Sequence, residues 1–309
     1  MNTLHLKYAL EIEKTKSITQ AADNLFMAQP NLSKVIKELE ESLGFVIFER
    51  TSKGAIPTKQ GTILLSYARN ILNQVDHIES ISKNLHHEIQ QFNVSIPRGS
   101  YIANSVVRFV EQLDFHKGIN VNVQETNSIQ AIANIVEHRF NLGVIRYDVA
   151  FENYFQDYLK DKDLVYEPIW EFENLVIFSQ EHPLAKKESL DISNFEDFVE
   201  LVHGDTTIPY LHHKKKLNYS ERDKKIYVYE RASQFEILEM IHGSYMLVSP
   251  IPETMLNRFH LVQRNYSGGS KRYKDVLIYH CDYSLSQLDR KFVDKLYESK
   301  NEVSFQAFK

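Results

Sequence analysis

Two short apolar stripes of helical period, separated by a brief interruption, constrain the fold of this chain more than any other feature. The first stripe consists of Ile18, Ala21, Ala22 and Leu25. The second stripe consists of Leu32, Val35, Ile36, Leu39 and Leu43. Ser17 and Gln20 have the S-x-x-Q spacing of a capping box, and Gly44 follows where a left-handed C-cap is expected. The pattern predicts two helices packed across a tight turn.

The second helix also has a polar face opposite its apolar stripe. That face carries Gln29, Pro30, Ser33, Lys34 and Lys37. The DNA major groove admits a helix and presents groups that Gln and Lys can read, while Ser and Lys also reach phosphates. The first turn of such a helix lies nearest the bases, which adds Asn31. On periodicity alone, an ordinary amphipathic helical hairpin with a solvated face accounts for the same pattern.

A short β-hairpin is predicted directly after the helix pair. The apolar run 45–48 precedes a turn at 52–54, and the chain returns through 55–57. Such a hairpin is the wing of a winged helix-turn-helix. Arg50 and Lys53 flank its tip, where they can contact phosphates or the minor groove. The alternative is that both are solvated loop charges.

The stretch from Ser17 to Gly61 resembles the DNA-binding domain of LysR-type transcriptional regulators. The residues that carry the resemblance, without a gap, are Ser17-Ile18-Thr19-Gln20-Ala21-Ala22, Leu25, Gln29-Pro30, Leu32-Ser33-Lys34, Ile36, Leu39-Glu40, Leu43-Gly44, Ile47-Phe48-Glu49-Arg50-Thr51 and Pro57-Thr58-Lys59-Gln60-Gly61. Two positions depart from the family pattern. Ala28 replaces the Ser that often caps the second helix, and Lys34 replaces an Arg, which keeps the charge but loses a bidentate fork. We include Thr19 of the first helix among the DNA-contact candidates.

A seven-residue apolar repeat follows the hairpin, on a long helix that Thr58 caps. Its positions are Leu64, Ala68, Ile71, Val75, Ile78, Ser82, Leu85 and Ile89. A sustained repeat of this kind is a coiled-coil seam that needs a partner. An intramolecular partner is the alternative, but no second heptad segment occurs, so self-association is predicted through residues 59–91. The resemblance implies the same: an antiparallel linker helix in a dimer, possible further pairing into tetramers, and an operator with two related half-sites.

Residues 92–309 change to alternating strand and helix patterns. Strands near 94–96, 119–123 and 142–145 alternate with helices, and this order predicts a mostly parallel sheet in an α/β fold. The later elements suit two lobes: lobe I comprises residues 92–161 and 267–309, and lobe II comprises residues 162–266. The first crossing is expected near Asp161 and the return near 266–270. The resemblance implies a periplasmic-binding-protein-like effector domain after the winged helix-turn-helix of residues 1–58.

Candidate ligand contacts follow three of the predicted strands. Ligands of open α/β sheets bind outside the carboxyl ends of the strands. That rule selects Arg98, Ser100, Thr126, Ser128 and His203, and the resemblance implies effector sites at matching places. Ser100 and Ser128 each begin a helix, where backbone N–H groups favour anions, so an anionic small-molecule effector is expected. The alternatives are that both serines are plain N-caps and that Arg98 pairs with a neighbouring Glu.

Charge and hydropathy narrow the class of protein. The formal net charge is −5, and residues 1–60 hold eight Lys and Arg against seven Asp and Glu. The chain is therefore no bulk polycation, and any DNA contact is local and shaped. No run approaches the roughly 18 apolar residues of a membrane span. The first fifteen residues lack the apolar core of a signal peptide, so a cytoplasmic location without a membrane partner is the simplest expectation.

Catalytic and metal-binding motifs are absent from the sequence. It contains no G-x-S-x-G, P-loop, G-x-G-x-x-G or H-E-x-x-H pattern, so no catalytic residue, metal ligand or cofactor is predicted. The basic run 212–216 reads as a solvated surface segment. The single cysteine, Cys281, cannot form an intrachain disulfide and is expected to be buried in a strand.

Together these patterns predict a sequence-specific, effector-responsive transcription regulator of LysR type that is not an enzyme. Its partners would be double-stranded DNA, a small molecule and a second copy of the chain. One alternative is a solute-binding protein or enzyme whose N-terminal helices form an interaction module. Another is an architectural DNA-binding protein with a vestigial cleft.

Overall fold

The structure, a computed structural model, describes residues 2–52, 54–83, 89–204, 224–229 and 231–305. The chain divides into two units. The N-terminal unit comprises Met1–Ile89 with Val136–Arg139, and the C-terminal unit comprises Gln90–Ile135 with Phe140–Lys309. Each unit has its own core. Across the described residues, no helix combines the length and the apolar character needed to cross a membrane.

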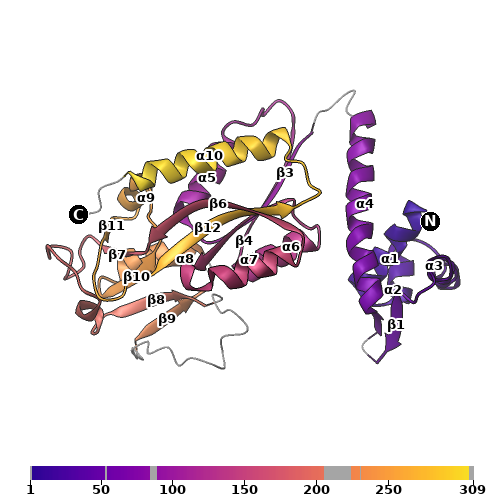
Figure 1. Ribbon diagram of the computed structural model, residues 1–309, viewed down its shortest axis with the longest axis horizontal. Coiled ribbons are helices and arrows are strands. Elements are labelled where there is room, and N and C mark those ends of the chain that lie inside the picture. Colours follow the sequence, from indigo (N-terminus) through magenta and orange to yellow (C-terminus); the bar gives the residue numbers. More distant parts are fainter. Residues whose placement is uncertain (1, 53, 84–88, 205–223, 230, 306–309) are drawn as a thin grey trace. The chain divides into compact units, whose positions relative to one another are not determined.

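The N-terminal unit is a helical domain with a two-stranded wing (Figure 1). Its elements are α1 (Thr3–Thr15), α2 (Ile18–Asn24), α3 (Gln29–Leu43), β1 (Phe48–Thr51), β2 (Gly54–Pro57) and α4 (Lys59–Lys83). Strands β1 and β2 pair antiparallel, with Thr51 opposite Gly54. The predicted winged helix-turn-helix is therefore the observed fold.

In the N-terminal unit, the helix ends follow the sequence signals with one exception. The Ser17 hydroxyl caps α2 by accepting from the Gln20 N–H at 3.3 Å. The Gln20 amide donates to Asn24 Oδ1 at 3.2 Å, one turn further along the helix, so the predicted reciprocal capping box forms in one direction only. Helix α3 ends at Gly44 with φ 78° and begins after Ala28, which provides no side-chain cap.

The two predicted apolar stripes form the core of the N-terminal unit together with α1. The buried residues of this cluster are Ala9, Ile12, Ala21, Ala22, Leu32, Ile36, Leu39, Ile47, Phe48, Ala55 and Leu65. The wing is fixed to the end of α1, because the Ala55 N–H donates to the Lys16 carbonyl at 2.8 Å. Gly54 has φ +102°, and a Cβ there would lie 2.2 Å from that carbonyl oxygen. Only glycine fits this position.

Part of the predicted apolar seam of helix α4 packs against another helix of the same chain. Leu6 of α1 packs against Ala68 and Leu72 of α4, so α1 is an intramolecular partner for this face. The helix ends at Lys83, and Leu85 lies outside the described residues. Ile89 begins strand β3 and is 55% exposed, so its assignment to the helical repeat was wrong. Ile89 belongs to a strand because β3 pairs within a sheet of the C-terminal unit. The spacing of apolar residues along the helix does not indicate that pairing.

The C-terminal unit contains two five-stranded sheets. The first has the order β4-β3-β5-β12-β6 and the second the order β11-β7-β10-β8-β9. The strands of the first are β3 (Ile89–Ile96), β4 (Gly118–Glu125), β5 (Leu142–Asp148), β6 (Leu164–Glu173) and β12 (Arg272–His280). The strands of the second are β7 (Leu175–Ser179), β8 (Val199–His203), β9 (Lys225–Val228), β10 (Ser244–Val248) and β11 (Leu261–Arg264). We call them the first and the second lobe.

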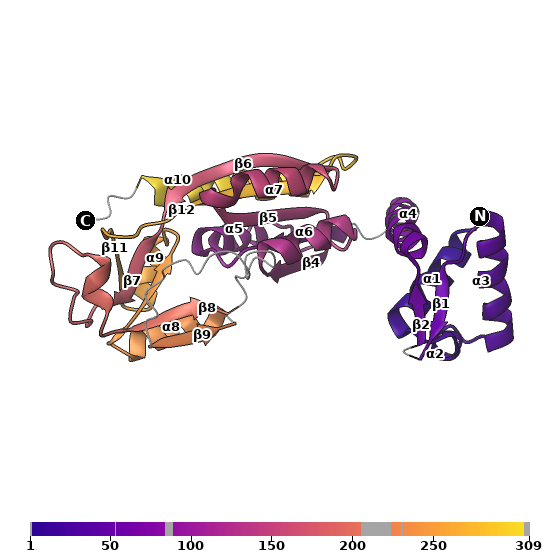
Figure 2. The ribbon, with the colours of Figure 1, turned by 60° about the horizontal axis from the view of Figure 1, so that its bottom comes forward.

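Helices complete both lobes. Those of the first lobe are α5 (Ser100–Val110), α6 (Ser128–Val136), the 3-10 turn η1 (Val149–Phe151), α7 (Glu152–Lys160) and α10 (Gln287–Ser304). Those of the second are the 3-10 turn η2 (Ile192–Phe195), α8 (Arg231–Met240) and α9 (Glu253–Arg258). Helices α5 and α10 lie side by side (Figures 1 and 2). The Phe109 and Phe292 rings meet edge to face between them, with centroids 6.0 Å apart.

The chain enters the second lobe at Asn174, and the expected crossing near Asp161 is corrected by the strand pairing. Strand β6 pairs with β12 along its length, from Leu164 opposite His280 to Glu173 opposite Arg272. It therefore belongs to the first lobe. Because its partner lies about a hundred residues later in the sequence, no local pattern could assign it. The return crossing, expected at 266–270, runs over residues 265–271.

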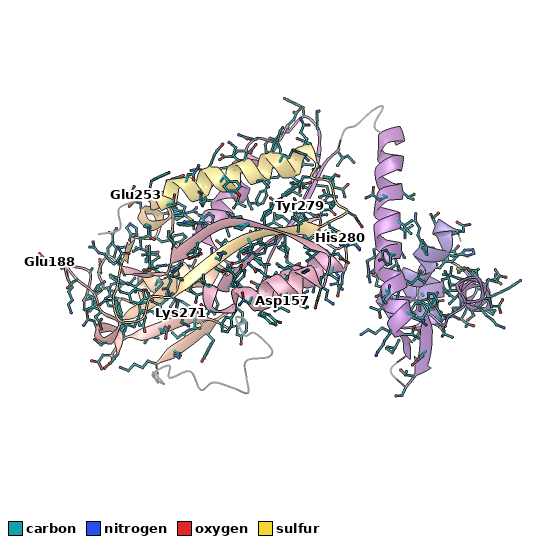
Figure 3. All side chains as sticks on the ribbon, in the orientation of Figure 1. Asp157, Glu188, Glu253, Lys271, Tyr279 and His280 are labelled. Atoms are coloured by element: carbon teal, nitrogen blue, oxygen red, sulfur yellow. The ribbon has the colours of Figure 1, made fainter. Side chains whose placement is uncertain are left out.

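The two crossing segments are fastened to each other. The Asn174 N–H donates to the Lys271 carbonyl at 3.0 Å, and the Lys271 N–H donates to Asn174 Oδ1 at 2.8 Å. Tyr266 donates to the same oxygen at 2.9 Å. Figure 3 labels Lys271 at this junction and His280 at the opposite end of β12. The lobes are thus joined by two crossing segments that are hydrogen-bonded to each other.

Candidate nucleic-acid interface and interlobe site

Helix α3 presents a polar surface opposite the core of the N-terminal unit. Pro30, Asn31, Lys34 and Lys37 are exposed, while Gln29 and Ser33 are half-buried. The Gln29 amide donates to Ser33 Oγ at 2.9 Å, which holds both side chains in one turn. The helix is oriented by its apolar stripe, of which Leu32, Ile36 and Leu39 are buried. The predicted base-contacting residues therefore share one accessible face.

The two lysines on this helix are partly neutralised. Lys34 pairs with Glu38 at 3.8 Å, and Lys37 pairs with Glu41 at 3.7 Å. Such exposed i,i+4 pairs contribute only about 0.3–0.5 kcal/mol each. A phosphate can displace either carboxylate at little cost, yet the unbound surface carries almost no net positive charge.

The other predicted DNA contacts flank α3. Thr19 is exposed in the first turn of α2. Arg50 lies in β1 opposite Ala55, but its side chain and the whole of Lys53 are outside the described residues. The turn between α2 and α3 holds Phe26 at φ 53°, a left-handed conformation that costs a non-glycine residue about 1–2 kcal/mol. Phe26 is almost fully exposed.

A buried ion pair lies where the first lobe faces the second. Arg146 of β5 stands directly opposite Asp275 of β12 in the sheet register. Its Nε and Nη2 atoms donate to the two Asp275 oxygens, each at 2.7 Å. Asp275 has no exposed surface and also accepts from the Tyr101 hydroxyl. The β6–β12 register shifts between Asp275 and Val276, an irregularity that can re-aim a side chain.

The Arg146 guanidinium also reaches the second lobe. Nη1 donates to Ser249 Oγ, just after β10, at 2.9 Å. The Phe172 ring centroid lies 4.8 Å from Arg146 Cζ. Burial opposes the charge, but the Asp275 carboxylate more than compensates, and the pKa of Arg146 is raised. Burial and the same carboxylate raise the pKa of Tyr101 well above its ordinary value. The arginine is thus a permanent cation.

The loops after β3 and β4 converge on this arginine. The Thr126 N–H donates to the Ile96 carbonyl at 2.9 Å, which joins the ends of the two strands. A Cβ on Gly99 would lie 2.8 Å from Arg146 Nη2, so the glycine allows the guanidinium to approach the loop. The Ser128 hydroxyl donates to the Arg146 carbonyl at 2.5 Å and accepts from the Arg146 N–H at 3.1 Å.

Several sequence-selected residues meet there. Ser100 and Ser128 each begin a helix as predicted, but neither is the N-cap that the alternative interpretation required. Helix α5 is capped at Gly99 rather than Ser100, and Ser100 is buried in its first turn. The Gln130 N–H donates to Asn127 Oδ1 at 2.9 Å, so Asn127 caps α6 in place of Ser128. Thr126 is buried. Within the described residues, the Ser100 and Thr126 hydroxyls make no hydrogen bond, so both remain open to a ligand.

Arg98 and His203 occupy different surroundings. Arg98 is half-buried in the loop after β3. His203 ends β8, which runs parallel to β10 with Leu201 opposite Met246. Because adjacent parallel strands end at one edge, His203 and Ser249 leave the second lobe at the same edge. The structure therefore assigns the five predicted contacts to strand ends in both lobes.

Cys281 is exposed and follows β12 in a turn, so its expected burial in a strand was wrong. With His280 and Asp282 it forms a group whose ligand-type atoms lie within 4.8 Å of one another. The Asp282 N–H donates to His280 Nδ1 at 3.3 Å, which occupies that lone pair. Desolvation and the Asp282 carboxylate raise the pKa of the Cys281 thiol. These features make the group a poor metal site.

Two family models match this chain. Residues 4–62 match the bacterial regulatory helix-turn-helix protein model of the lysR family, and residues 101–240 match the LysR substrate binding domain. The chain belongs to the LysR family. The first matched region contains α3 with its polar face, and the second contains Arg146 and the loop after β4.

Relatives of this LysR-family chain are transcription regulators. It is 29% identical over 146 residues to the regulator DgcR of Pseudoalteromonas sp., covering 47% of this chain and 50% of that one. It is 28% identical over 151 residues to the regulator BenM of Acinetobacter baylyi, covering 48% and 49% respectively. The chain thus spans about half the length of these curated relatives. Both are named as regulators rather than as enzymes.

Solved structures extend the likeness in fold to nearly the whole LysR-family chain. The full-length regulator LysG of Corynebacterium glutamicum, with the effector Arg bound, covers 98% of this chain and 99% of its own, with a TM-score of 0.59 and 16% identity. Full-length CbnR in complex with its target DNA covers 97% and 100%, with a TM-score of 0.56 and 14% identity. These values establish a shared fold.

The buried cluster of Arg146, Asp275, Tyr101 and Ser249 in this LysR-family chain was not predicted from the sequence. One signal was present, because Arg146 follows the apolar run 142–145 and Asp275 precedes the apolar run 276–278. A charge inside a buried strand requires a partner. The sequence did not say which partner, since the two residues lie 129 positions apart.

Proposed function

We propose that this chain is a sequence-specific DNA-binding transcription regulator whose C-terminal unit responds to a small-molecule effector. The observation that carries the proposal is the outer face of α3. Gln29, Asn31 and Lys34 are accessible on a helix whose opposite face is fixed in the core. A helix of this kind can enter the major groove with its first turn toward the bases.

In this proposal, some residues of α3 contact bases and others contact phosphates. Gln29 and Asn31 hydrogen-bond to base edges, and the Gln29–Ser33 contact opens when the amide turns to a base. Lys34 and Lys37 exchange their glutamate partners for phosphates, with Thr19, Arg50 and Lys53 as further backbone contacts. CbnR, which has the same fold, is solved with its target DNA, and that likeness supports the reading.

We further propose that the chain works as a dimer on an operator with two related half-sites. The N-terminal sixty residues are almost neutral, so one copy gains little non-specific affinity. Val75 of the predicted seam is only half-buried, which leaves part of α4 for a second copy. We infer no catalytic role and no cofactor. The function is carried by binding alone.

The effector proposed here bears a carboxylate or a similar oxyanion and lies beside Arg146. Asp275 occupies one edge of the guanidinium, while Nη1 donates to the Ser249 hydroxyl. A carboxylate that displaces Ser249 replaces a neutral acceptor by an anionic one beside the guanidinium cation, which strengthens the hydrogen bond. The open Ser100 and Thr126 hydroxyls would orient its remainder, with Arg98, Ser128 and His203 further out.

The DNA-binding part is tested by selecting the preferred sequence of the full-length chain from random duplexes. Lys34→Ala is expected to weaken binding to the selected duplex about ten-fold. It should also reduce the slope of log affinity against log salt concentration by about one. Lys291→Ala removes an exposed charge from α10 and serves as the control. An absence of any selected sequence, or equal losses in the two variants, would contradict the proposal.

The effector-binding part is tested separately by a thermal-shift screen of mono- and dicarboxylic acids and amino acids. We expect at least one compound to raise the melting temperature of the wild type. Thr126→Val removes a hydroxyl at nearly constant volume and should reduce that shift. If no carboxylate stabilises the chain while neutral compounds do, the proposed ligand class is wrong.

A further inference from the structure

One aromatic side chain of the N-terminal unit stands outside its core. Phe26 is 97% exposed, the highest value among the large apolar side chains of the described residues. It lies in the turn between α2 and α3, three residues before Gln29. Its neighbours Leu25 and Met27 both pack against the core. Burial therefore explains the residues on either side of Phe26 but not Phe26 itself.

The backbone at this position favours a different residue. The Met27 N–H donates to the Ala22 carbonyl at 3.0 Å, and the Phe26 N–H donates to the Asp23 carbonyl at 3.1 Å. These two hydrogen bonds form a Schellman motif, whose left-handed residue is usually Gly or Asn. Phe26 occupies that place with φ 53°. A phenylalanine here is strained and gains no packing in the unbound protein.

We propose that Phe26 is an apolar DNA contact that packs against the C5-methyl group of a thymine in the major groove. This inference rests on the proposed function. Three residues span at most about 10 Å, which places Phe26 close to the first turn of α3, the part of the helix that would face the bases. The thymine methyl is the one apolar group that base edges present there.

The rigidity of the turn favours such a contact. Both flanking side chains are anchored, and two hydrogen bonds fix the backbone, so little conformational freedom is lost when the ring meets DNA. A phenyl group cannot bind phosphate, so the contact adds sequence preference without adding salt dependence. It would complement an α3 surface whose charges are largely balanced.

The test uses the full-length chain and the duplex that it selects. Phe26→Gly relieves the strained conformation, so its melting temperature should equal or exceed that of the wild type. Its affinity for the selected duplex should fall about five- to ten-fold with an unchanged salt slope. Met240→Ala removes an exposed apolar side chain from α8 and should leave binding unaltered.

Replacing each thymine of the selected duplex by deoxyuridine removes one methyl group at a time. At one thymine position in each half-site, deoxyuridine should lower the affinity of the wild type. The same replacement should not lower the affinity of Phe26→Gly any further. Equal losses in both proteins at every position would overturn the thymine contact. Unchanged binding by Phe26→Gly would overturn any DNA contact by this residue. A wild type that selects no sequence would instead reject the proposed function.

Discussion

The two units of this chain are organised by interactions of very different range. In the N-terminal unit the core comes from stripes that repeat every three or four residues, and the exposed lysines of α3 pair within that helix. In the C-terminal unit the central contact joins Arg146 to Asp275, which lie far apart in the sequence and belong to adjacent strands. Local order thus builds the proposed DNA surface, whereas long-range order builds the proposed effector site.

The burial of charge differs in the same way. The side chains of Lys34 and Glu38 are 77% and 51% exposed, whereas those of Arg146 and Asp275 are 15% and 0% exposed. Solvent screens the first pair, so its loss costs little. The second pair is shielded from solvent, and removing one partner leaves a buried charge.

The largest effect is expected from Asp275→Asn, which leaves the buried Arg146 cation without a counter-charge. The C-terminal unit should lose about 3–5 kcal/mol of unfolding free energy. Trp170, the only tryptophan, lies opposite Asp275 in the β6–β12 pairing, and its ring centroid is 5.5 Å from that of Tyr101. Its fluorescence during urea unfolding therefore reports on this unit.

The double variant Arg146→Met with Asp275→Asn provides the control. It removes both charges, while the Asn oxygen can still accept from Tyr101. This double variant should be more stable than the single variant. If it is equally unstable, lost packing rather than an unpaired charge explains the effect.

The next largest effect is expected from His182 in the second lobe. Its protonation on unfolding should lower the unfolding free energy at pH 4.5 by about 2–3 kcal/mol relative to pH 7. His182 is buried between the Phe178 and Phe198 rings, with centroids 4.7 Å and 4.5 Å away. Burial lowers its pKa to about 4 from 6.5. The unfolded chain therefore takes up a proton near pH 6.5, whereas the folded chain does so only near pH 4. The contribution of neutral His182 to the unfolding free energy is complete above pH 6.5 and is lost as the pH falls toward 4.

His182→Asn isolates that contribution. In the wild type, His182 Nδ1 accepts a hydrogen bond from the Leu184 N–H at 3.0 Å. The side-chain oxygen of asparagine can accept the same hydrogen bond, but asparagine does not titrate. The stability difference between pH 7 and pH 4.5, measured by urea unfolding, should be smaller in this variant than in the wild type. An identical pH dependence in both proteins would assign the acid sensitivity to other groups.

The sequence predicted the N-terminal unit closely because its determinants are local. The apolar stripes, the Gly44 C-cap and the hairpin turn each depend on residues a few positions apart. The C-terminal unit was predicted only as a two-lobed α/β fold. Strand β6 was assigned to the wrong lobe, since its partner β12 is distant in sequence, and the Arg146–Asp275 pair escaped for the same reason. Even Ser128 kept its helix-start position while its hydroxyl turned to the backbone of β5.

A smaller effect is expected from Ala28→Ser at the start of α3. The helix begins there without a side-chain cap, and a serine hydroxyl can accept from the Asn31 N–H. We expect about 1 kcal/mol of local stabilisation, which should slow hydrogen exchange of that amide about five-fold. Exchange in β12 should not change, because the gain is confined to one helix end. Equal slowing in both units would show that the N-terminal and C-terminal units do not respond independently.

The smallest stability effect, and the most direct test of the neutral DNA surface, is expected from Glu38→Gln with Glu41→Gln. Each substitution removes an exposed ion pair and costs α3 only about 0.3–0.5 kcal/mol. It also releases Lys34 and Lys37 for phosphates, so affinity for a random duplex at low salt should rise about two-fold per pair. Affinity for the selected duplex should rise no more than this, because the carboxylates oppose all DNA equally. Filter binding of the two duplexes across salt concentrations measures both quantities. If random-duplex affinity stays at the wild-type value, the glutamates do not compete with phosphates, and the near-neutral surface has no bearing on selectivity.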